Sequence, residues 1–354
     1  ATVLNYNEEF ALFKTEIQKF LRSVLDIKGA IKSSQKSIND IAAEAAKNKH
    51  QRVRLFYKIA IPIIKGYQDY CENKSYLDFD DLISYSLKLF KEHANTKERY
   101  QDRFQYVLVD EFQDVDNQQV QFLKNLVSNK SQLFCVGDDW QSIYGFRGSE
   151  IEYIVNFKEH FLNPKIIKLN LNYRSTDAIV KASNEIIKKN RFQVSKEISA
   201  VQKGGAKIEV HYEELKGESE NFIWEKVKQL VEQGIPQEEI LILYRRSAMI
   251  GTIQKSLKAS GVNVQFKTIH GSKGLEAQVV FILGLNSAPG GFPDPWMQDK
   301  IYHVIKKTEY NTLLEEERRL FYVALTRAKK HLFLMSQKGN VSEFIKDIPK
   351  DLML

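Results

Sequence analysis

FQYVLVDEFQDVDNQQ, residues 104–119, contains the pattern that decides the fold. Five apolar side chains between Phe104 and Val109 lead into the acidic pair Asp110 and Glu111. A short apolar run of this kind is typical of a buried strand, and open α/β sheets bind ligands just beyond the carboxyl ends of their strands. A carboxylate at that place can hold Mg²⁺, and a second one can take a proton from an attacking water.

Two acidic residues after a strand can also do no more than cap the next helix. For an isolated Asp-Glu pair that interpretation would be favoured. Here Gln113 and Asp114 follow at once, and a second polar cluster ends the next apolar run, QLFCVGDD (132–139). The repeated polar density favours a ligand site at the edge of the sheet and leaves the cap as the alternative.

Short apolar runs alternate with amphipathic helical patterns from about residue 76 onward. Examples of the apolar runs are QYVLVD (105–110), EILILYR (239–245) and AQVVFILGL (277–285), whereas ESENFIWEKVKQLVEQG (218–234) has a helical pattern. Strands that alternate with helices predict parallel sheets covered on both faces, which is the α/β class. The runs are too many for one compact sheet, so we expect two α/β domains that meet at Asn163-Pro164.

The first 75 residues have a different pattern. Apolar residues recur at intervals of three and four in FALFKTEIQKFLRSVL (10–25) and in VRLFYKIAIPIIKGYQDYC (53–71). This spacing predicts helices that each have one apolar face. We expect a helical subdomain that packs beside the first α/β domain.

Composition describes an ordinary globular chain of 354 residues, with 43% hydrophobic and 27% charged residues. The net charge of +7 fits a nucleic-acid partner but does not require one. The two cysteines, Cys71 and Cys135, form no C-x-x-C motif, so neither a disulfide framework nor a structural zinc site is expected. This cysteine usage favours a reducing cytoplasm. No membrane partner is expected, because no apolar run approaches the roughly 20 residues that span a bilayer.

A second candidate site is VGDDWQSIYGFRGSE (136–150). Gln141 lies just beyond a predicted strand end, where its amide can contact a γ-phosphate. Tyr144, Phe146 and Arg147 place two aromatic rings and a guanidinium within four positions. Aromatic faces stack on unpaired bases, and arginine adds phosphate or cation–π contacts. The alternative is a core loop in which both aromatic rings are buried.

A third candidate is Arg174 in LNLNYRST (169–176), at the end of the apolar run KIIKLNLNYRS (165–175). This segment predicts a strand that turns into a helix, with Thr176 as the N-cap. A guanidinium fixed at such a turn can stabilise charge on a transferring phosphoryl group, an effect of roughly a thousandfold or more in rate. A surface arginine on a turn is the common alternative.

Six segments carry a resemblance to a known family. In chain order they are LDFDDL (77–82), VDEFQD (109–114), GDDWQSIYGFRG (137–148), NYRS (172–175), TIHGSKGLEA (268–277) and EEERRLFYVALTRA (315–328). With these segments the chain resembles the UvrD/Rep family of superfamily 1 DNA helicases, and most closely its helicase IV branch. The resemblance covers about residues 76–335.

The resemblance implies RecA-like domains of the P-loop NTPase type. Residues 1–75 would form a helical subdomain (1B-like), residues 76–164 the C-terminal part of the first RecA-like domain (1A-like), and residues 165–354 a complete second one (2A-like). SGVNVQF (260–266) runs directly into the fifth motif, so this sequence has no 2B insertion of the kind found in larger members. Because that insertion commonly regulates unwinding, the strength of strand separation stays open.

The resemblance also implies roles at an ATP site. The family roles that transfer are Mg²⁺ ligand (Asp110), general base (Glu111), γ-phosphate contact (Gln141), adenine stack (Tyr173), ribose contact (Glu276) and phosphate contacts (Arg174, Arg327). For single-stranded DNA, the residues expected from the resemblance are Tyr144, Phe146, Arg147, Thr268, His270 and Ser272. An isolated histidine such as His270 is more often structural, and its place in the motif is what favours a DNA contact.

One family feature is missing from this sequence. No G-x-x-x-x-G-K-[ST] phosphate loop (Walker A) occurs, and the dipeptide Gly-Lys is absent. Family members carry that loop upstream of the helical segment with which this chain opens. The expectation is a helicase chain without its N-terminal part, as a cut fragment, a truncated gene product or one half of a split protein, with the missing helicase segment as a partner.

Two functions of different classes follow from these patterns. The first is part of an ATP-dependent 3′–5′ DNA helicase or translocase, of the kind that serves DNA repair, in which this chain alone would be inactive because it lacks the phosphate loop. The second is a helicase-derived module that binds DNA or protein without hydrolysis. The presence of Glu111, Gln141, Arg174 and Arg327 favours the first, because a module freed from catalysis has no chemical need for them.

Overall fold

The structure is a computed structural model that describes residues 6–34, 36–215, 217–246, 250–287, 290–294, 300–305 and 309–354. Contacts between Cα atoms divide the chain into two compact units. The first comprises residues 1–137, 144–153 and 298–308, and the second comprises residues 138–143, 154–297 and 309–354. The turn at 138–143 therefore belongs with the second unit, although its neighbours on both sides belong to the first. The predicted limits of the three domains stay a prediction.

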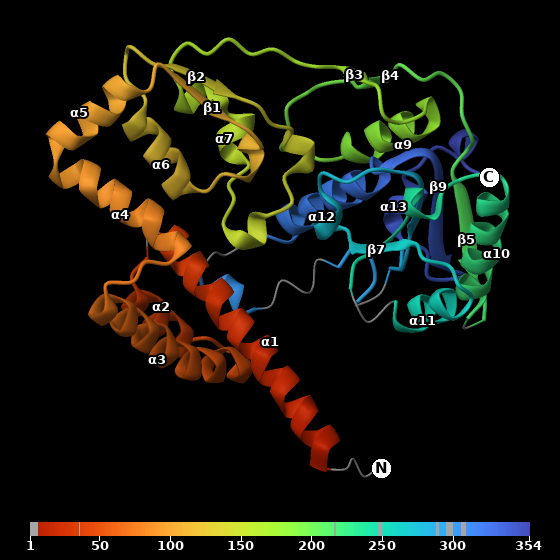
Figure 1. Ribbon diagram of the computed structural model, residues 1–354, viewed down its shortest axis with the longest axis horizontal. Coiled ribbons are helices and arrows are strands. Elements are labelled where there is room, and N and C mark those ends of the chain that lie inside the picture. The colour runs from red at the N-terminus through yellow and green to blue at the C-terminus, as the bar shows by residue number, and fades with distance from the viewer. Residues whose placement is uncertain are drawn as a thin grey trace. The chain divides into compact units, whose positions relative to one another are not determined.

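Three helices form the N-terminal part of the first unit: α1 (Tyr6–Ser33), α2 (Ile38–Ala46) and α3 (Gln51–Lys74), drawn in red and orange in Figure 1. Their apolar faces share one buried core, which also includes Ile301, Val304 and Ile305. The prediction of a helical N-terminal region is thus confirmed. Residues 1–5 and Gln35, which it also covered, lie outside the described residues.

The rest of the first unit is a small α/β layer. Its strands β1 (Tyr106–Val109) and β2 (Gln132–Cys135) are parallel neighbours. Its helices α4 (Phe79–Glu92), α5 (Ala94–Arg103) and α6 (Asn117–Leu126) pack against one another. The ring of Phe90 on α4 stacks on that of Phe122 on α6, with 5.8 Å between the ring centroids.

One face of the β1–β2 pair is uncovered among the described residues. Val107 is buried, but Tyr106, Leu108 and Phe134 are 70%, 73% and 58% exposed. Successive side chains of a strand point to opposite faces, so the three exposed side chains mark one apolar face of the pair. The prediction of a buried strand covered on both faces is therefore wrong for β1, which is covered on one face alone.

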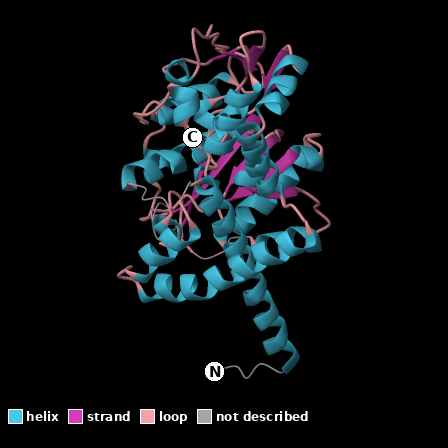
Figure 2. Ribbon diagram, turned by 90° about the vertical axis from the view of Figure 1, so that its left-hand side faces the viewer, coloured by secondary structure: helices cyan, strands magenta, loops and turns pink. Residues whose placement is uncertain are grey.

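The second unit contains a five-stranded parallel sheet in the order β5–β9–β8–β6–β7. Its strands are β5 (Glu209–Glu213), β6 (Ile240–Tyr244), β7 (Gln265–Thr268), β8 (Ala277–Ile282) and β9 (Ala328–Gln337). Figure 2 shows strands in magenta with helices in cyan around them. This arrangement confirms the predicted α/β class with parallel sheets.

Alternation along the central strands explains why helices cover both faces of this sheet. On β6, Ile240 and Ile242 point into a core with α10 (Glu218–Glu232) and α11 (Gly251–Ala259). Leu241 and Leu243 alternate with them and are equally buried. The helices α9 (Asp177–Ile187) and α12 (Tyr310–Leu325) pack together, and α12 contacts β8 and β9.

The predicted strand over residues 165–172 is mostly absent. Only Leu171–Asn172 (β3) is a strand, which pairs in parallel with β4 (Ser199–Ala200). Residues 165–170 have no ladder partner in the described chain, and Ile166, Ile167 and Leu169 are exposed. The apolar pattern alone cannot form a strand there, since a strand needs a neighbour for its backbone hydrogen bonds.

Shorter elements complete the description. They are helices α7 (Glu152–Val155), α8 (Phe157–His160) and α13 (Glu343–Lys346), and 3₁₀ helices η1 (Phe112–Asp114), η2 (Asp139–Gln141), η3 (Gly145–Arg147), η4 (Gln237–Glu239), η6 (His270–Ser272), η8 (Tyr302–Val304) and η9 (Lys350–Leu352). None of the described helices combines the length and the apolar character needed to cross a membrane.

The LDFDDL segment (77–82) connects the start of α4 to α1 through ion pairs. Asp78 caps α4, and its carboxylate accepts from the backbone N–H of Asp81. Lys28 and Lys32, one turn apart on α1, reach this cap: Lys28 Nζ contacts Asp78 and lies 2.9 Å from Asp80, and Lys32 Nζ lies 2.5 Å from Asp81. Because Lys28 is buried, these carboxylates are what makes its charge tolerable there.

We expect Asp78→Ala to lower the free energy of unfolding of the first unit by about 3 kcal/mol, the lower end of what breaking a buried ion pair costs, because Asp80 still reaches Lys28. Urea titration measures this. Asp102→Ala, which removes an exposed partner of Lys130, is the matched control and should cost less than about 1 kcal/mol. Equal losses in the two variants would contradict a special role for Asp78.

The pH dependence of this variant follows from the pKa of Asp78. Burial opposes ionisation, but the hydrogen bonds from Lys28 and from the backbone of Asp81 prevail and hold the pKa of Asp78 well below its usual value of 3.8. A depressed carboxylate contributes stability above the unfolded pKa and loses it as the pH falls towards the folded one. The stability gap between wild type and Asp78→Ala should therefore be full at pH 6 and should narrow below about pH 4.

Candidate functional site

The acidic pair stands directly after β1 in the first unit. Asp110 and Glu111 are both exposed, and one Asp110 carboxylate oxygen accepts from the backbone N–H of Glu111 at 2.8 Å. Glu111 has φ +51°, a left-handed conformation that is unusual for a glutamate. The next residue, Phe112, is fully buried and donates its backbone N–H to the Val136 carbonyl at 2.8 Å.

These contacts explain how a strained turn persists at this place. The buried Phe112 fixes the backbone after Glu111, and β1 fixes the backbone before it. Glu111 is therefore held in its left-handed conformation from both sides. The buried Gln113 amide donates to the Glu111 carboxylate and so orients it. The turn presents two carboxylates at the carboxyl end of a parallel strand, which is where α/β sheets bind ligands.

Tyr144, Phe146 and Arg147 also lie in the first unit and form one cluster on and beside η3. The Arg147 guanidinium lies 5.7 Å from the Tyr144 ring centroid and 5.5 Å from that of Phe146. Arg147 is exposed and both rings are half-buried, so neither ring is a core side chain. The alternative of a core loop does not describe this cluster. Next to it, Gly148 (φ +96°) packs so closely on Ser33 of α1 that an added Cβ would lie 3.2 Å from the Ser33 Cβ.

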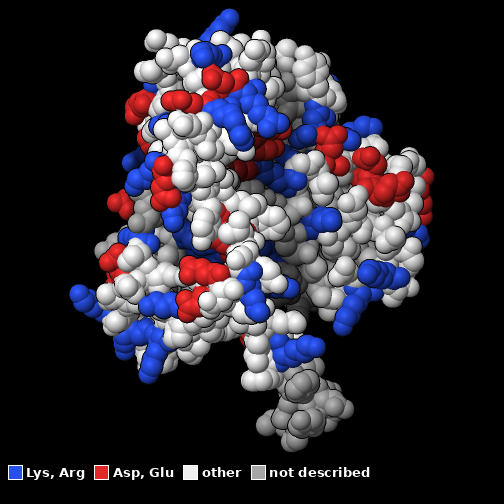
Figure 3. Space-filling model, turned by 60° about the vertical axis from the view of Figure 1, so that its left-hand side comes forward, with Lys and Arg blue, Asp and Glu red and all other residues white. Residues whose placement is uncertain are grey.

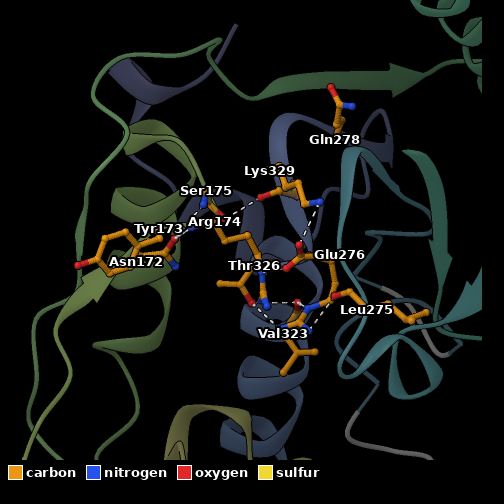
Figure 4. Close-up of polar contacts among 12 residues, drawn as sticks. Asn172, Tyr173, Arg174, Ser175, Leu275, Glu276, Gln278, Val323, Thr326 and Lys329 are labelled. Atoms are coloured by element: carbon orange, nitrogen blue, oxygen red, sulfur yellow. Dashed lines mark hydrogen bonds and ion pairs between the residues drawn. The ribbon is translucent and has the colours of Figure 1, made fainter. Parts of the chain in front are cut away.

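In the second unit, Arg327 lies between the end of α12 and the start of β9. Three residues that accept its hydrogen bonds, Val323, Leu275 and Thr326, are labelled in Figure 4. Arg327 is 2% exposed. Its Nε donates to the Val323 carbonyl and one terminal nitrogen donates to the Leu275 carbonyl, each at 3.0 Å. The other terminal nitrogen donates at 3.3 Å to the side-chain oxygens of Gln141 and Thr326.

Arg174 and Glu276 form an ion pair beside this group. The Arg174 Nε donates to one carboxylate oxygen of Glu276 at 2.5 Å, and Lys329 Nζ lies 3.0 Å from the other oxygen. A terminal nitrogen of Arg174 also reaches the Thr326 carbonyl at 3.4 Å. Residues from four motifs, Gln141, Arg174, Glu276 and Arg327, therefore meet in one unit.

The charges of this group favour an anionic ligand. Burial and, after it, the nearby Arg174 charge lower the pKa of Arg327 to about 10. Lys329 and, after it, Arg174 hold the pKa of Glu276 below its usual value by donating hydrogen bonds, against the opposing effect of burial. Two cations, Arg174 and Lys329, thus contact the Glu276 carboxylate, and the Arg327 guanidinium lies close enough to feel the Arg174 charge. A polyphosphate would relieve the repulsion between the two guanidinium groups.

Tyr173 and Thr268 occupy the margins of the second unit's candidate site. The Tyr173 ring is 69% exposed and points away from Glu276 in Figure 4, while its carbonyl accepts from the Gln202 side chain at 2.9 Å. Thr268 ends β7, and its hydroxyl accepts from the Gly271 backbone N–H at 3.0 Å. An exposed ring such as that of Tyr173 is free to stack on a flat base.

His270 and Ser272 differ in exposure although they belong to the same 3₁₀ helix. His270 is half-buried, whereas Ser272 is fully buried and its hydroxyl donates to the Ile269 carbonyl at 2.7 Å. The Ser272 hydroxyl is thus engaged within its own turn, and the expected DNA contact of this residue stays a prediction. Any contact at that residue would have to come from its backbone.

The net charge alone does not locate a DNA site. On the face drawn in Figure 3, Lys and Arg side chains are interspersed with Asp and Glu and form no uninterrupted basic patch. The aromatic and arginine cluster of η3 is more specific than the charge. Sequence reasoning missed Lys329, whose only signal is that it follows the arginine motif directly, at the start of β9.

Comparison with models of protein families identifies the chain's family. The UvrD/REP helicase N-terminal domain matches residues 4–162, and the UvrD-like helicase C-terminal domain matches residues 167–267 and 261–339. The chain belongs to the UvrD/REP helicase family. Helicase activity, ATP binding and DNA binding are features of this family.

Several helicases of known sequence are similar to this chain. The "Probable DNA helicase II homolog" of Mycoplasma capricolum is 37% identical over 62% of this chain and 30% of its own length. The ATP-dependent DNA helicase PcrA of Staphylococcus epidermidis is 31% identical over 73% of this chain and 34% of its own length. DNA helicase IV of Escherichia coli is 31% identical over 83% of this chain and 42% of its own length. The chain thus spans less than half the length of these three relatives.

Among solved structures, the C-terminal domain of a possible DNA helicase from Lactobacillus plantarum is 19% identical to this chain. It covers 51% of this chain and 97% of its own, with a TM-score of 0.35.

We expect tripolyphosphate to stabilise the second unit by binding the cations around Glu276. At a ligand concentration tenfold above Kd, the free energy of unfolding should rise by about 1.4 kcal/mol. Arg174→Gln should weaken this binding at least about tenfold, because a charge-assisted hydrogen bond contributes roughly 1.5–3 kcal/mol. Thermal melts over a range of tripolyphosphate concentrations measure both effects.

Lys228→Gln is the matched control for this titration. Lys228 is an exposed cation on α10 of the same unit, so its loss should leave the affinity unchanged. Identical affinities for wild type and Arg174→Gln would show that tripolyphosphate binds elsewhere.

Proposed function

We propose that this chain is part of an ATP-dependent DNA helicase or translocase that moves 3′ to 5′ on single-stranded DNA. The observation that carries the proposal is the meeting of Gln141, Arg174, Glu276 and Arg327 in the second unit. These side chains come from four segments that are far apart in sequence. A phosphate-contacting role explains why the two guanidinium groups lie near each other although only Arg174 is paired with Glu276.

We further propose RecA-like architecture for both α/β parts, the domain limits 1–75, 76–164 and 165–354, and membership of the helicase IV branch. The all-parallel sheet of the second unit supports the RecA-like architecture. The helicase IV branch is supported by the short connection between α11 and β7, residues 260–264, which leaves no room for a helical insertion. A place in DNA repair and in the cytoplasm remains a prediction from the resemblance.

The residues of the second unit fit a nucleotide. In the proposal, Arg174 and Arg327 contact the phosphates, Gln141 contacts the γ-phosphate, Glu276 binds the ribose and the exposed Tyr173 ring stacks on the adenine. All three guanidinium nitrogens of Arg327 donate hydrogen bonds within its unit. A contact with phosphate therefore requires Arg327 to exchange at least one of these bonds, and the 3.3 Å bond to Gln141 is longer than the two to backbone carbonyls and easier to exchange.

The residues of the first unit fit Mg²⁺ in part. Mg²⁺ is held in nucleotide sites by one or two carboxylates together with phosphate oxygens and water, and it neutralises charge on the transferred group. Asp110 would supply such a carboxylate. Glu111, oriented by Gln113, would accept the proton of the attacking water.

For DNA, we propose that single strands bind at Tyr144, Phe146 and Arg147, with Thr268 and His270 along the backbone. Two half-buried rings beside an exposed guanidinium support stacking on bases with an added phosphate contact. Gln141 would link this segment to the nucleotide, because it is separated from Tyr144 by two residues only.

The second candidate is a helicase-derived module that binds DNA or protein without hydrolysis. The absence of a phosphate loop from this sequence favours it. The strained Glu111 turn and the buried Arg327 network speak for catalysis, since a binding module needs neither. The reading frame upstream of Ala1 discriminates: a glycine-lysine-threonine loop encoded there favours the enzyme.

The uncovered face of β1 and β2 supports a partner segment. Tyr106, Leu108 and Phe134 form an apolar face at the strand that ends in Asp110. A soluble protein rarely leaves such a face in water. We propose that the helicase segment with the phosphate loop covers it, either as part of the same polypeptide or as a second chain.

This chain by itself should hydrolyse ATP at no useful rate. Without a phosphate loop, the β- and γ-phosphates lack their backbone N–H donors and lysine. Removing even one preorganised donor costs about 10²–10³ in rate, so we expect DNA-stimulated phosphate release to be at least roughly a thousandfold below that of the protein completed by the loop segment.

Glu111→Gln is the control for contaminating ATPase in both proteins. Release by the completed protein that disappears in Glu111→Gln supports the proposal. Robust release by the 354-residue chain alone that also disappears in Glu111→Gln would show that other residues of the chain supply the phosphate-binding groups.

Phe146→Ala should weaken the binding of single-stranded DNA by about 1–3 kcal/mol, because one base loses its stacking partner. Fluorescence anisotropy with an oligothymidine at several salt concentrations measures the loss, and wild-type affinity should fall steeply with salt. Phe79→Ala, which removes an exposed phenylalanine from α4, is the matched control. Equal affinities for wild type and Phe146→Ala would remove Phe146 from the DNA site.

A further inference from the structure

The turn of Gln141 is held by a lysine from a distant loop of the same unit. Lys196, whose side chain is 13% exposed, has its Nζ 2.6 Å from a carboxylate oxygen of Asp138 and 2.6 Å from one of Asp139. The ammonium also lies 4.5 Å from the ring centroid of Trp140, which is fully buried. Lys196 therefore contacts three successive residues of one short turn.

The turn that Lys196 contacts also holds Gln141, which in turn is hydrogen-bonded to Arg327. The second Asp138 oxygen accepts from the Gln141 side-chain amide at 2.7 Å. The Gln141 oxygen accepts from Arg327 at 3.3 Å. One continuous chain of polar contacts thus runs from Lys196 through Asp138 to Gln141 and Arg327.

The loop that carries Lys196, residues 190–196, is itself fixed on α12. The Asn190 side chain accepts from Arg318 at 2.8 Å and donates to the Glu315 carbonyl at 2.9 Å. The Phe192 carbonyl accepts from Arg319 at 2.8 Å. Further along, the loop donates the Val194 N–H to Asp139 at 2.7 Å. This loop therefore links the helix before Arg327 to the turn that holds Gln141.

We propose that Lys196 is a positioning residue for nucleotide hydrolysis: it holds the Asp138–Gln141 turn so that the Gln141 side chain faces Arg327. The inference rests on the proposed function, since it assigns Lys196 a part in the same reaction. Lys196 contacts Asp138, Asp139 and Trp140 but not the side chains of Gln141 or Arg327, so it acts through Asp138. The opposite view is that the ion pairs only stabilise the fold.

The chemistry of the site explains why the turn depends on the ammonium. Asp138 and Asp139 are neighbours in sequence, and Asp139 is buried. Without Lys196, two like charges would share a site with little water and would repel each other. Although burial opposes it, the two carboxylates raise the pKa of Lys196, so the ammonium keeps its charge throughout the neutral range.

The first test uses hydrogen exchange on the 354-residue chain. The backbone N–H groups of Gln141 and Ser142 donate within the turn, to Asp138 at 2.9 Å and to Asp139 at 3.2 Å, so their exchange reports its opening. Lys196→Met keeps the stem over Trp140 and removes the charge. We expect at least tenfold faster exchange of these two amides, with less than twofold change in β8.

Two further variants sharpen this test. Lys196→Arg retains the charge and should keep exchange within threefold of wild type. Lys189→Met removes another lysine–aspartate pair of the same unit, with Asp347, and should leave the turn unchanged. Unchanged exchange of Gln141 and Ser142 in Lys196→Met, or equal acceleration throughout β8, would overturn the proposal.

The second test measures ATP hydrolysis by the protein that includes the phosphate-loop segment. Lys196→Met should lower kcat at least tenfold while KM for ATP changes less than threefold. Gln141→Ala should have a similar effect, and the double variant should be no more than about twofold slower than Gln141→Ala, because both changes remove one function. Additive losses, or an unchanged kcat in Lys196→Met, would overturn the positioning role.

The two tests separate this inference from the proposed function. A completed wild-type protein that hydrolyses no ATP would refute the proposed function, and the inference with it, whatever the exchange data show. Normal wild-type hydrolysis with an unaffected Lys196→Met variant would refute the inference alone.

Discussion

The buried guanidinium of Arg327 sets the geometry of the second unit's site. A buried charge is tolerated only when its donors are satisfied, and here they are satisfied by three separate segments. Val323 and Thr326 belong to the end of α12, Leu275 belongs to the loop before β8, and Gln141 belongs to the turn at 138–143. Each of the three segments must be in place for the Arg327 charge to remain buried, so the position of Arg327 depends on all of them.

Glu276 has a second part in this balance. It is the carboxylate that neutralises Arg174 and Lys329 while no phosphate is near. An anionic ligand would compete with Glu276 for the same guanidinium, so binding would exchange one ion pair for another instead of creating charge contacts from nothing. Such an exchange lowers the net gain from each contact, yet it keeps Arg174 oriented before the ligand arrives. For catalysis, an Arg174 side chain that is oriented before the ligand binds contributes more than a higher affinity for the ligand.

Sequence patterns predicted correctly the features that depend on short-range interactions. The apolar run before Asp110 did form a strand with the acidic pair at its carboxyl end, and alternation of strands and helices predicted the parallel sheet of the second unit. The misses concern pairing over long distances. Lys196 meets Asp138 across 58 positions, and no spacing rule connects them. Ser272 lies in a motif whose sequence shows nothing of its burial, and residues 165–170 have an apolar pattern but no neighbouring strand among the described residues.

The uncovered apolar face of β1 lies close to the two carboxylates at the end of the same strand. Leu108 is two positions before Asp110, so whatever covers Leu108 also lies beside the strand end that presents the two carboxylates. Parallel strands end at the same edge of a sheet, and a further parallel strand beside β1 would place its own carboxyl end next to Asp110 and Glu111. A phosphate loop follows such a strand end. A strand–loop–helix segment would therefore serve both needs: its strand would bring a phosphate cradle beside the acidic pair, and its helix would bury the apolar face of β1.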